Sequence, residues 1–155
     1  MRVRRTSCRL GEEHGQSLVE LALVMPMLIA IIIGIVDVGW LAYSYVELTN
    51  GANAGVHYAA QTYATAGDLN GIKAAVNADA GNLTGITTTL SNVCTCSDGT
   101  SGVTCANAAT TCVSPARIID TITVTAKATA KPLFKFPAIP SSMNMQASAT
   151  MQRQE

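Results

Sequence analysis

The longest apolar stretch of the chain runs from Leu18 to Val36, and Glu20 is the only ionisable residue within it. Beyond Asp37, the apolar residues Val38, Trp40 and Leu41 extend this stretch, and about 20 apolar residues in a helix span the hydrocarbon core of a bilayer. The alternative is a buried core helix, but a chain of 155 residues could hardly cover such a helix on every side. We therefore expect a membrane span at about residues 18–41.

The helical spacing of apolar residues continues beyond this span, which predicts one helix over about residues 16–64, bent at Pro26 where a backbone donor is missing. Its apolar stripe comprises Val38, Leu41, Tyr45, Leu48, Ala52, Val56 and Ala59. Gly51 and Gly55 have the spacing of small residues that allows close packing. We expect them to pack against the chain's own sheet, with a helix–helix contact in an assembly as the alternative.

The remainder of the chain changes from helical to strand periodicity. Asp68 is expected to cap a short helix whose inner face holds Ile72 and Val76 and which stops at Gly81. Alternation over 86–90, 122–130 and 143–151 then predicts strands, the last two as an antiparallel pair. The expected fold class is α+β: a long N-terminal transmembrane helix (16–64) that continues into a small extracytoplasmic domain (65–155) with a short helix and an antiparallel β-sheet.

The distribution of positive charge predicts which way the span is oriented. Four arginines precede the apolar stretch, and no lysine or arginine follows it until Lys73. Because basic residues near a span stay in the cytoplasm, we expect a cytoplasmic N-terminus and an exported C-terminal domain. A cleaved secretory signal is the alternative, but the apolar stretch is too long and lacks a small-x-small cleavage site.

Composition narrows the possible partners. The formal net charge is zero, and no basic cluster occurs after the first nine residues, so a nucleic-acid partner is not expected. Charged residues make up only 13% of the chain, which suits a membrane protein with a polar, uncharged exported domain.

Five cysteines are divided between the two ends of the chain. Cys8 precedes the span, whereas four lie within residues 94–112 of the exported part: Cys94, Cys96, Cys105 and Cys112. An even number of cysteines in an oxidising compartment predicts two disulfides in a cysteine-rich loop. The crossed pairing (94–105, 96–112) and the nested pairing (94–112, 96–105) both stay open. A zinc site is the less favoured alternative, because the spacing departs from paired C-x₂₋₄-C knuckles.

The sequence offers no catalytic constellation. Its two histidines are His14, before the span, and His57, in a predicted helix without an acidic neighbour in sequence. No nucleophile-elbow, zinc-protease or phosphate-loop motif occurs. We expect neither an enzyme nor a bound cofactor or metal.

A processing signal is predicted immediately before the apolar stretch. A basic leader (1–15) ends at Gly15, and Glu20 follows five residues later inside the apolar helix. This is the arrangement of prepilin-type signals, in which a membrane peptidase would cut after Gly15 and leave Gln16 as the new N-terminus. Glu20 would then pair with the N-terminal amine of a neighbouring subunit, which offsets the cost of a charge in hydrocarbon. The alternative is that Glu20 lies in the headgroup region at the helix start.

A family resemblance rests on four segments. The stretch from Gly15 to Pro26, together with residues 34–39, 48–55 and 58–60, resembles the TadE-like family of minor pilin-like proteins from tight-adherence (Tad) pilus systems. Family members commonly have Phe and Arg where this chain has Leu21 and Trp40.

The resemblance implies a location in the bacterial inner membrane, with incorporation in a surface filament as one outcome. It implies other pilin-like or pilus-assembly proteins as partners, together with a prepilin peptidase, and a component of a Tad-type pilus or secretion system that acts through protein contacts. The alternative is a stationary single-pass protein whose disulfide-tied domain binds a ligand or envelope partner.

Overall fold

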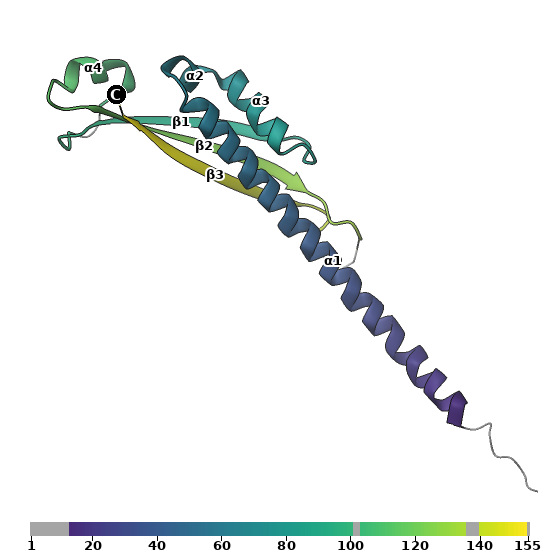
Figure 1. The fold of residues 1–155 in the computed structure, drawn as a ribbon. Helices are drawn as coiled ribbons and strands as arrows, with labels where there is room; N and C mark the ends of the chain where they lie inside the picture. Colours follow the sequence, from purple (N-terminus) through teal and green to yellow (C-terminus); the bar gives the residue numbers. More distant parts are fainter. Residues whose placement is uncertain (1–12, 101–102, 136–139, 155) are drawn as a thin grey trace, which may run out of the picture. The chain divides into compact units, whose positions relative to one another are not determined.

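The computed structural model describes residues 13–100, 103–135 and 140–154. The leader residues 1–12, with the four arginines and Cys8, lie outside the described residues. The chain divides into two compact units between Val38 and Gly39. Helix α1 (Glu13–Ala59) passes through Pro26 without interruption (Figure 1).

The prediction of one helix as far as residue 64 is wrong at its C-terminal end. α1 stops at Ala59, and a separate short helix, α2, covers Tyr63–Gly67. The reason is a capping box. The Thr65 backbone N–H donates to the Thr62 hydroxyl (3.1 Å), and the Thr62 backbone N–H donates to the Thr65 hydroxyl (2.9 Å). These reciprocal bonds satisfy backbone donors at the start of a new helix, so the chain turns here.

The predicted short helix is confirmed as α3 (Leu69–Asp79). Asp68 is its N-cap, since its Oδ1 atom accepts a hydrogen bond from the Gly71 backbone N–H at 3.0 Å. Ile72 and Val76, one turn apart, are fully buried and form its inner face.

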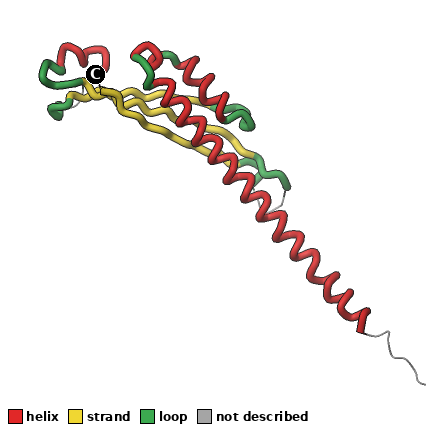
Figure 2. Tube along the Cα trace, viewed as in Figure 1, coloured by secondary structure: helices red, strands yellow, loops and turns green. Residues whose placement is uncertain are grey.

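The sheet has three antiparallel strands in the order β1-β2-β3: β1 (Thr87–Cys96), β2 (Ile118–Ala130) and β3 (Met143–Gln154). The predicted antiparallel pairing of the last two strands is confirmed, with Val124 opposite Ala149 in register. β1 pairs with the other side of β2 and is longer than expected. The α+β fold class is therefore confirmed (Figure 2).

One face of the sheet forms the core of the Gly39–Glu155 unit. Figures 1 and 2 show α1, α2 and α3 on the same side of the three strands. The helices contribute Leu48, Ala52, Val56, Ala59, Ala66, Ile72 and Val76, and the strands contribute Ile122, Val124, Ala126, Ala128, Ala147 and Ala149. Because alanine side chains are small, the helices can approach the sheet closely at these positions.

The other face of the sheet is polar. Thr123 and Thr150 are cross-strand partners whose hydroxyls lie 2.9 Å apart, and Thr129 donates to the Asn144 side-chain oxygen at 3.0 Å. Such pairs add modestly to sheet stability and need no cover from apolar groups. The side chains of β2 therefore alternate between a buried apolar face of the sheet and a solvated face that carries hydroxyl groups.

Gly51 and Gly55 pack within the chain, but their main partner is α3. A β-carbon at Gly55 would lie 2.6 Å from Val76 Cγ2 and 3.2 Å from Val124 Cγ1, and one at Gly51 would lie 2.9 Å from the Val76 carbonyl oxygen. The expectation of packing on the sheet alone is thus corrected. Val124 supplies the contact with the sheet, and α3 supplies the rest.

The predicted apolar stripe of α1 is correct only from Leu48 onward. Tyr45 and Val38 are 50% and 68% exposed, whereas Ser44 and Glu47 are buried in their place. The Ser44 hydroxyl bonds to the Trp40 carbonyl oxygen, and the Glu47 carboxylate accepts a hydrogen bond from the Asn82 side chain. These hydrogen bonds give Ser44 and one carboxylate oxygen of Glu47 partners at core-facing positions, so apolar periodicity misplaced this part of the stripe.

Candidate functional site

The N-terminal part of α1 exposes large apolar side chains. Leu23, Met27 and Ile35 are 75%, 68% and 67% exposed. Within the described part of the chain, α1 is the one helix long and apolar enough to cross a membrane, and its most apolar window is not buried at all in the protein. A core helix would bury such side chains, so this segment is consistent with membrane anchoring.

The predicted processing residues lie in the first two turns of α1. Gly15 has open space where a β-carbon would stand. Gln16 and Glu20 are both exposed and lie one turn apart on one face of the helix, with Gln16 Nε2 3.5 Å from Glu20 Oε1. Cleavage after Gly15, and pairing of Glu20 with a neighbouring amine, stay predictions.

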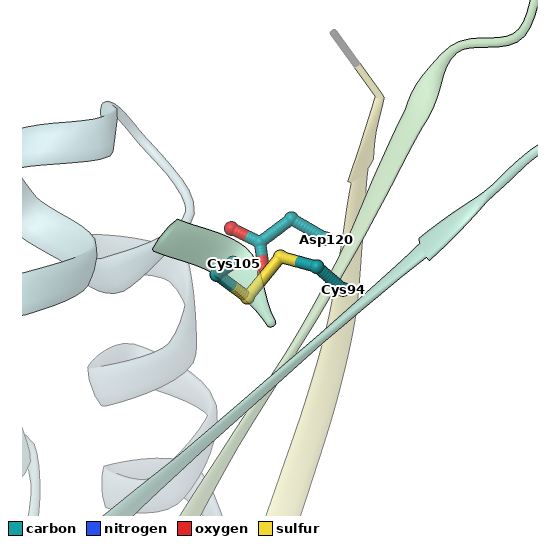
Figure 3. Close-up of side chains that lie close together, drawn as sticks. All are labelled: Cys94, Cys105 and Asp120. Carbon is teal, nitrogen blue, oxygen red and sulfur yellow. A yellow bond between two sulfur atoms is a disulfide. The ribbon is translucent and has the colours of Figure 1, made fainter. Parts of the chain in front are cut away.

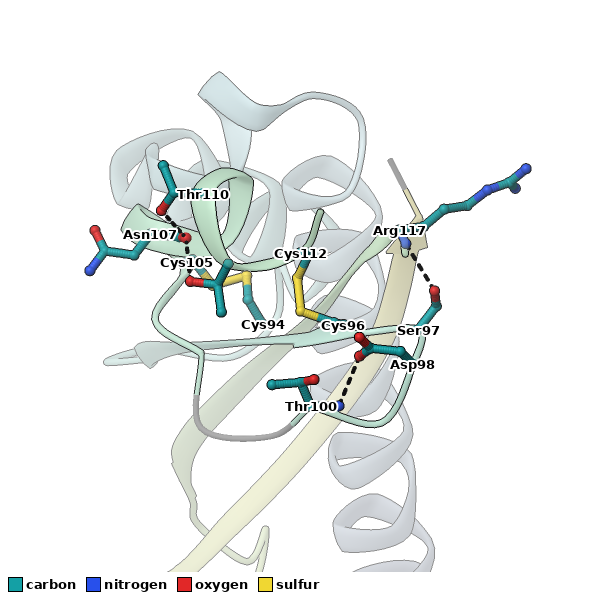
Figure 4. Close-up of a disulfide and its surroundings, with 11 residues drawn as sticks. Cys94, Cys96, Ser97, Asp98, Thr100, Cys105, Asn107, Thr110, Cys112 and Arg117 are labelled. Atoms are coloured by element: carbon teal, nitrogen blue, oxygen red, sulfur yellow. Dashed lines mark hydrogen bonds between the residues drawn. A yellow bond between two sulfur atoms is a disulfide. The ribbon is translucent and has the colours of Figure 1, made fainter. Parts of the chain in front are cut away.

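The four cysteines of residues 94–112 form the second candidate site. Cys94 and Cys96 both belong to β1, and because strand side chains alternate, both sulfurs lie on one face. Cys94 is joined to Cys105 and Cys96 to Cys112, with Cα–Cα distances of 5.0 and 5.4 Å (Figure 4). The structure therefore has the crossed pairing, which is one of the two pairings that the sequence left open.

The cysteine-rich loop is more ordered than the sequence indicated. β1 extends through Cys96, and a 3₁₀ helix η1 (Cys105–Asn107) leads directly into α4 (Ala108–Thr111). The Asn107 carbonyl oxygen accepts hydrogen bonds from the hydroxyls of Thr110 and Thr111, both at 2.9 Å (Figure 4). Segments this short do not hold a helix alone, so the disulfides at both ends stabilise them.

The turn after β1 is tied to the segment that enters β2. The Ser97 backbone N–H donates to the Arg117 carbonyl oxygen (2.9 Å), and the Arg117 backbone N–H donates to the Ser97 hydroxyl (2.8 Å). Inside the turn, Asp98 accepts a hydrogen bond from the Thr100 backbone N–H at 3.0 Å (Figure 4). This bond favours the carboxylate and lowers the pKa of Asp98.

A buried ion pair lies beside the Cys94–Cys105 disulfide. Asp120 in β2 is 3% exposed, and its Oδ2 atom accepts a hydrogen bond from Arg153 Nη2 in β3 at 2.9 Å. The guanidinium also lies 5.7 Å from the centre of the Tyr63 ring. Figure 3 shows the Asp120 carboxylate next to the disulfide, and Asp120 Oδ1 is 3.7 Å from Cys94 Sγ. Because a disulfide sulfur carries no proton, this is a packing contact.

Sequence reasoning missed this ion pair, although the sequence contained a signal for it. Asp120 is in phase with the buried positions Ile122 and Val124 of β2, and Arg153 is in phase with Ala149 of β3. A charged residue at a core-facing position of a strand needs a partner of opposite charge. Two such residues near the paired ends of two strands would have predicted the contact.

The disulfide end does not have the properties of a metal centre or of a ligand pocket. Cys94, Cys105 and Asp120 cluster closely enough to hold a metal, but both cysteines are in a disulfide and offer no thiolate. The cavity between them, Tyr63 and Arg153 has a volume of about 150 Å³. Pockets for drug-sized ligands are about 300–1,000 Å³. His57 is exposed on α1, away from the disulfide-bonded segments in sequence.

The comparisons with known proteins add one finding. The family described as TadE-like protein matches residues 15–57, which lie within α1 and include both the apolar segment and the Gly51–Gly55 pair. No curated protein and no solved structure matches the chain.

Proposed function

Since the chain carries a TadE-like domain at residues 15–57, we propose that it is a membrane-anchored, pilin-like component of a Tad-type pilus assembly or secretion system. The match to this family carries the proposal, and it covers the same helix whose apolar side chains are exposed. The protein acts through contacts with other pilin-like or pilus-assembly proteins. A non-enzymatic role accords with the pilin-like character of the TadE-like family.

The proposed topology places the N-terminus in the cytoplasm and the Gly39–Glu155 unit outside it. The four leader arginines and the absence of lysine and arginine from the span to Lys73 support this direction. Two disulfides in the exported unit are also in keeping with an oxidising compartment.

We further propose that a prepilin peptidase removes residues 1–15. Mass spectrometry of the protein purified from cells with an active prepilin peptidase should find Gln16 at the N-terminus. Gly15→Leu is a suitable test variant, because the β-carbon position of Gly15 meets nothing within 4 Å and the change leaves the fold intact. It should retain the leader, whereas Glu20→Gln tests whether the carboxylate is needed after cleavage. A wild-type protein that still begins at Met1 or Arg2 contradicts processing.

The pilus role is tested by deletion and complementation in the cells that encode the protein. Deletion should abolish or strongly reduce surface pili and adherence, and the wild-type gene should restore both. Pili and adherence that are unchanged after deletion would favour the alternative, a stationary anchored domain that binds a ligand or envelope partner. The small cavity at the disulfide end gives that alternative little support.

A further inference from the structure

A short apolar and basic segment follows β2 directly. We call residues Lys131-Pro132-Leu133-Phe134-Lys135 the KPLFK segment. It begins immediately after Ala130, the last residue of β2. Leu133 and Phe134 are 52% and 45% exposed, and the lysines on either side are also exposed. Large apolar side chains next to each other at the surface commonly mark a site that contacts another apolar phase.

The fold places the start of this segment beside the end of the apolar stretch of α1. Lys131 lines a cavity of about 170 Å³ together with Trp40 and Ser44 of α1. Trp40 in turn stacks on Tyr43, with ring centres 6.0 Å apart. Tryptophan and tyrosine mark the level of the lipid headgroups at the ends of membrane spans. Lys131 therefore lies beside the aromatic pair that is expected to mark this level.

Charge indicates which kind of partner the segment contacts. From Thr121 to Gln154 the sequence contains no aspartate or glutamate, whereas Lys127, Lys131 and Lys135 follow one another at four-residue spacing. A basic segment without acidic residues is attracted to anionic phospholipid, and apolar side chains between its lysines can enter the acyl boundary while the ammonium groups stay at the phosphates.

We propose that the KPLFK segment is a second membrane contact, which docks on the anionic phospholipid headgroups beside the point where α1 leaves the bilayer. Leu133 and Phe134 insert at the interface, and Lys131 and Lys135 contact lipid phosphates. This proposal rests on membrane anchoring by α1. It adds a contact made by the sheet, which restrains the exported unit against the bilayer surface in addition to the single helical tether.

The test measures how deeply a tryptophan side chain enters the bilayer when it is placed at either of two positions in the chain. In a Trp40→Phe background, Phe134→Trp places the only indole of the chain in the segment, and Val113→Trp places it on the disulfide-tied part as the matched control; Val113 is 69% exposed. The full-length variants are reconstituted in liposomes of zwitterionic and anionic phospholipid with bromine on the acyl chains. We expect the Phe134→Trp indole to be quenched and blue-shifted, and the Val113→Trp indole to be unaffected.

A second arm tests the role of charge. In anionic liposomes, Lys131→Gln and Lys135→Gln should each lower the equilibrium constant for docking of the segment by about fivefold. Added salt should also lower this constant, because it screens the attraction between lysine and phosphate. Lys73→Gln, an exposed lysine on α3, is the matched control and should leave the quenching unchanged.

Flotation of the same liposomes distinguishes the two proposals. A protein that does not float with the lipid overturns anchoring, and the segment contact with it. A protein that floats while the Phe134→Trp indole stays unquenched overturns the segment contact alone and leaves the anchor in place. Protection of that indole only when a pilus-assembly protein is added would also overturn it, in favour of a protein partner.

Discussion

Asp68 joins α1 and α3 through one carboxylate. Its Oδ1 atom caps α3, and its Oδ2 atom accepts a hydrogen bond from the Tyr58 hydroxyl of α1 at 2.9 Å. Hydrogen bonds lower the pKa of Asp68: the largest effect comes from the Gly71 backbone N–H and the next largest from the Tyr58 hydroxyl. The same hydrogen bond to Asp68 raises the pKa of Tyr58. The ionised form of Asp68 is therefore the one that the folded state favours.

This arrangement predicts a pH dependence of stability. Because the folded-state pKa of Asp68 is lowered, its contribution is present above the unfolded pKa, near pH 4, and is lost as the pH falls through the folded pKa. Asp68→Asn keeps a good N-cap but cannot titrate. Thermal unfolding of the full chain in detergent should lose less stability below about pH 4 in this variant than in the wild type.

Asp68→Ala is the control for the cap itself. It removes both the cap and the charge, so it should be less stable than Asp68→Asn at neutral pH. Asp98 also has a lowered pKa, so its contribution to the loss of stability in acid remains in every variant. Identical acid profiles for the wild type and Asp68→Asn would contradict the assignment.

Gly55 is the position where α1 comes closest to its neighbours. A methyl group there would meet Val76 Cγ2 at 2.6 Å and Val124 Cγ1 at 3.2 Å, so α3, the sheet or both would have to move. Overpacking of this kind costs about 1–3 kcal/mol, against a gain of about 1 kcal/mol in helix propensity. Gly55→Ala should therefore lower the free energy of unfolding or leave no net gain.

Gly39→Ala is the matched comparison on the same helix. Nothing lies within 4 Å of the β-carbon position of Gly39, so the variant should gain stability by up to about 1 kcal/mol. Chemical denaturation of both variants in the same detergent gives the comparison. A Gly55→Ala protein as stabilised as Gly39→Ala would show that the packing of α1 on α3 is looser than described.

At the scale of elements, β1 organises the disulfide-tied end. A Cys-x-Cys pair on a strand presents two sulfurs on one face, spaced so that each reaches a different part of the following segment. Cys94 holds the start of η1, and Cys96 holds the end of α4. The crossed pairing thus ties both ends of the η1–α4 segment to β1.

Non-reducing peptide mapping of the purified full-length protein should therefore recover peptides that link Cys94 to Cys105 and Cys96 to Cys112. Replacing both members of either pair by serine should lower stability by about 2–4 kcal/mol and expose the segment between β1 and β2 to protease. Cys8→Ser, the same change in the leader, should have no such effect. Nested links, or four free thiols, would contradict the pairing.

At the scale of the whole molecule, membrane topology is the property on which the other proposals depend. The arginine-rich leader predicts that the C-terminus lies outside the cytoplasm. Alkaline phosphatase, which needs disulfides to fold, should be active when fused after Glu155, whereas a cytoplasm-dependent fluorescent reporter should stay dark. Replacing the four leader arginines by serine should weaken this preference. A C-terminal reporter that works only in the cytoplasm would invert the topology.

Local periodicity alone predicted several parts of this protein. The apolar helix, the Asp68 cap of α3, and the alternation of β2 and β3 are confirmed because each depends on residues close together in the chain. The residues that carry the TadE-like match are equally local, and the match at residues 15–57 agrees with the resemblance stated from the sequence.

Contacts between distant segments decided the rest. The crossed disulfides, the Asp120–Arg153 ion pair and the packing of Gly55 on Val76 of α3 each join positions whose proximity depends on strand register and on where helices turn. The break after Ala59 shows why: once the chain turns at Thr62, α3 lies against α1, and a glycine pair expected to meet the sheet meets mainly α3, with Val124 as its contact in the sheet. Spacing along a chain encodes which face a side chain takes, but only the assembled fold determines what that face meets.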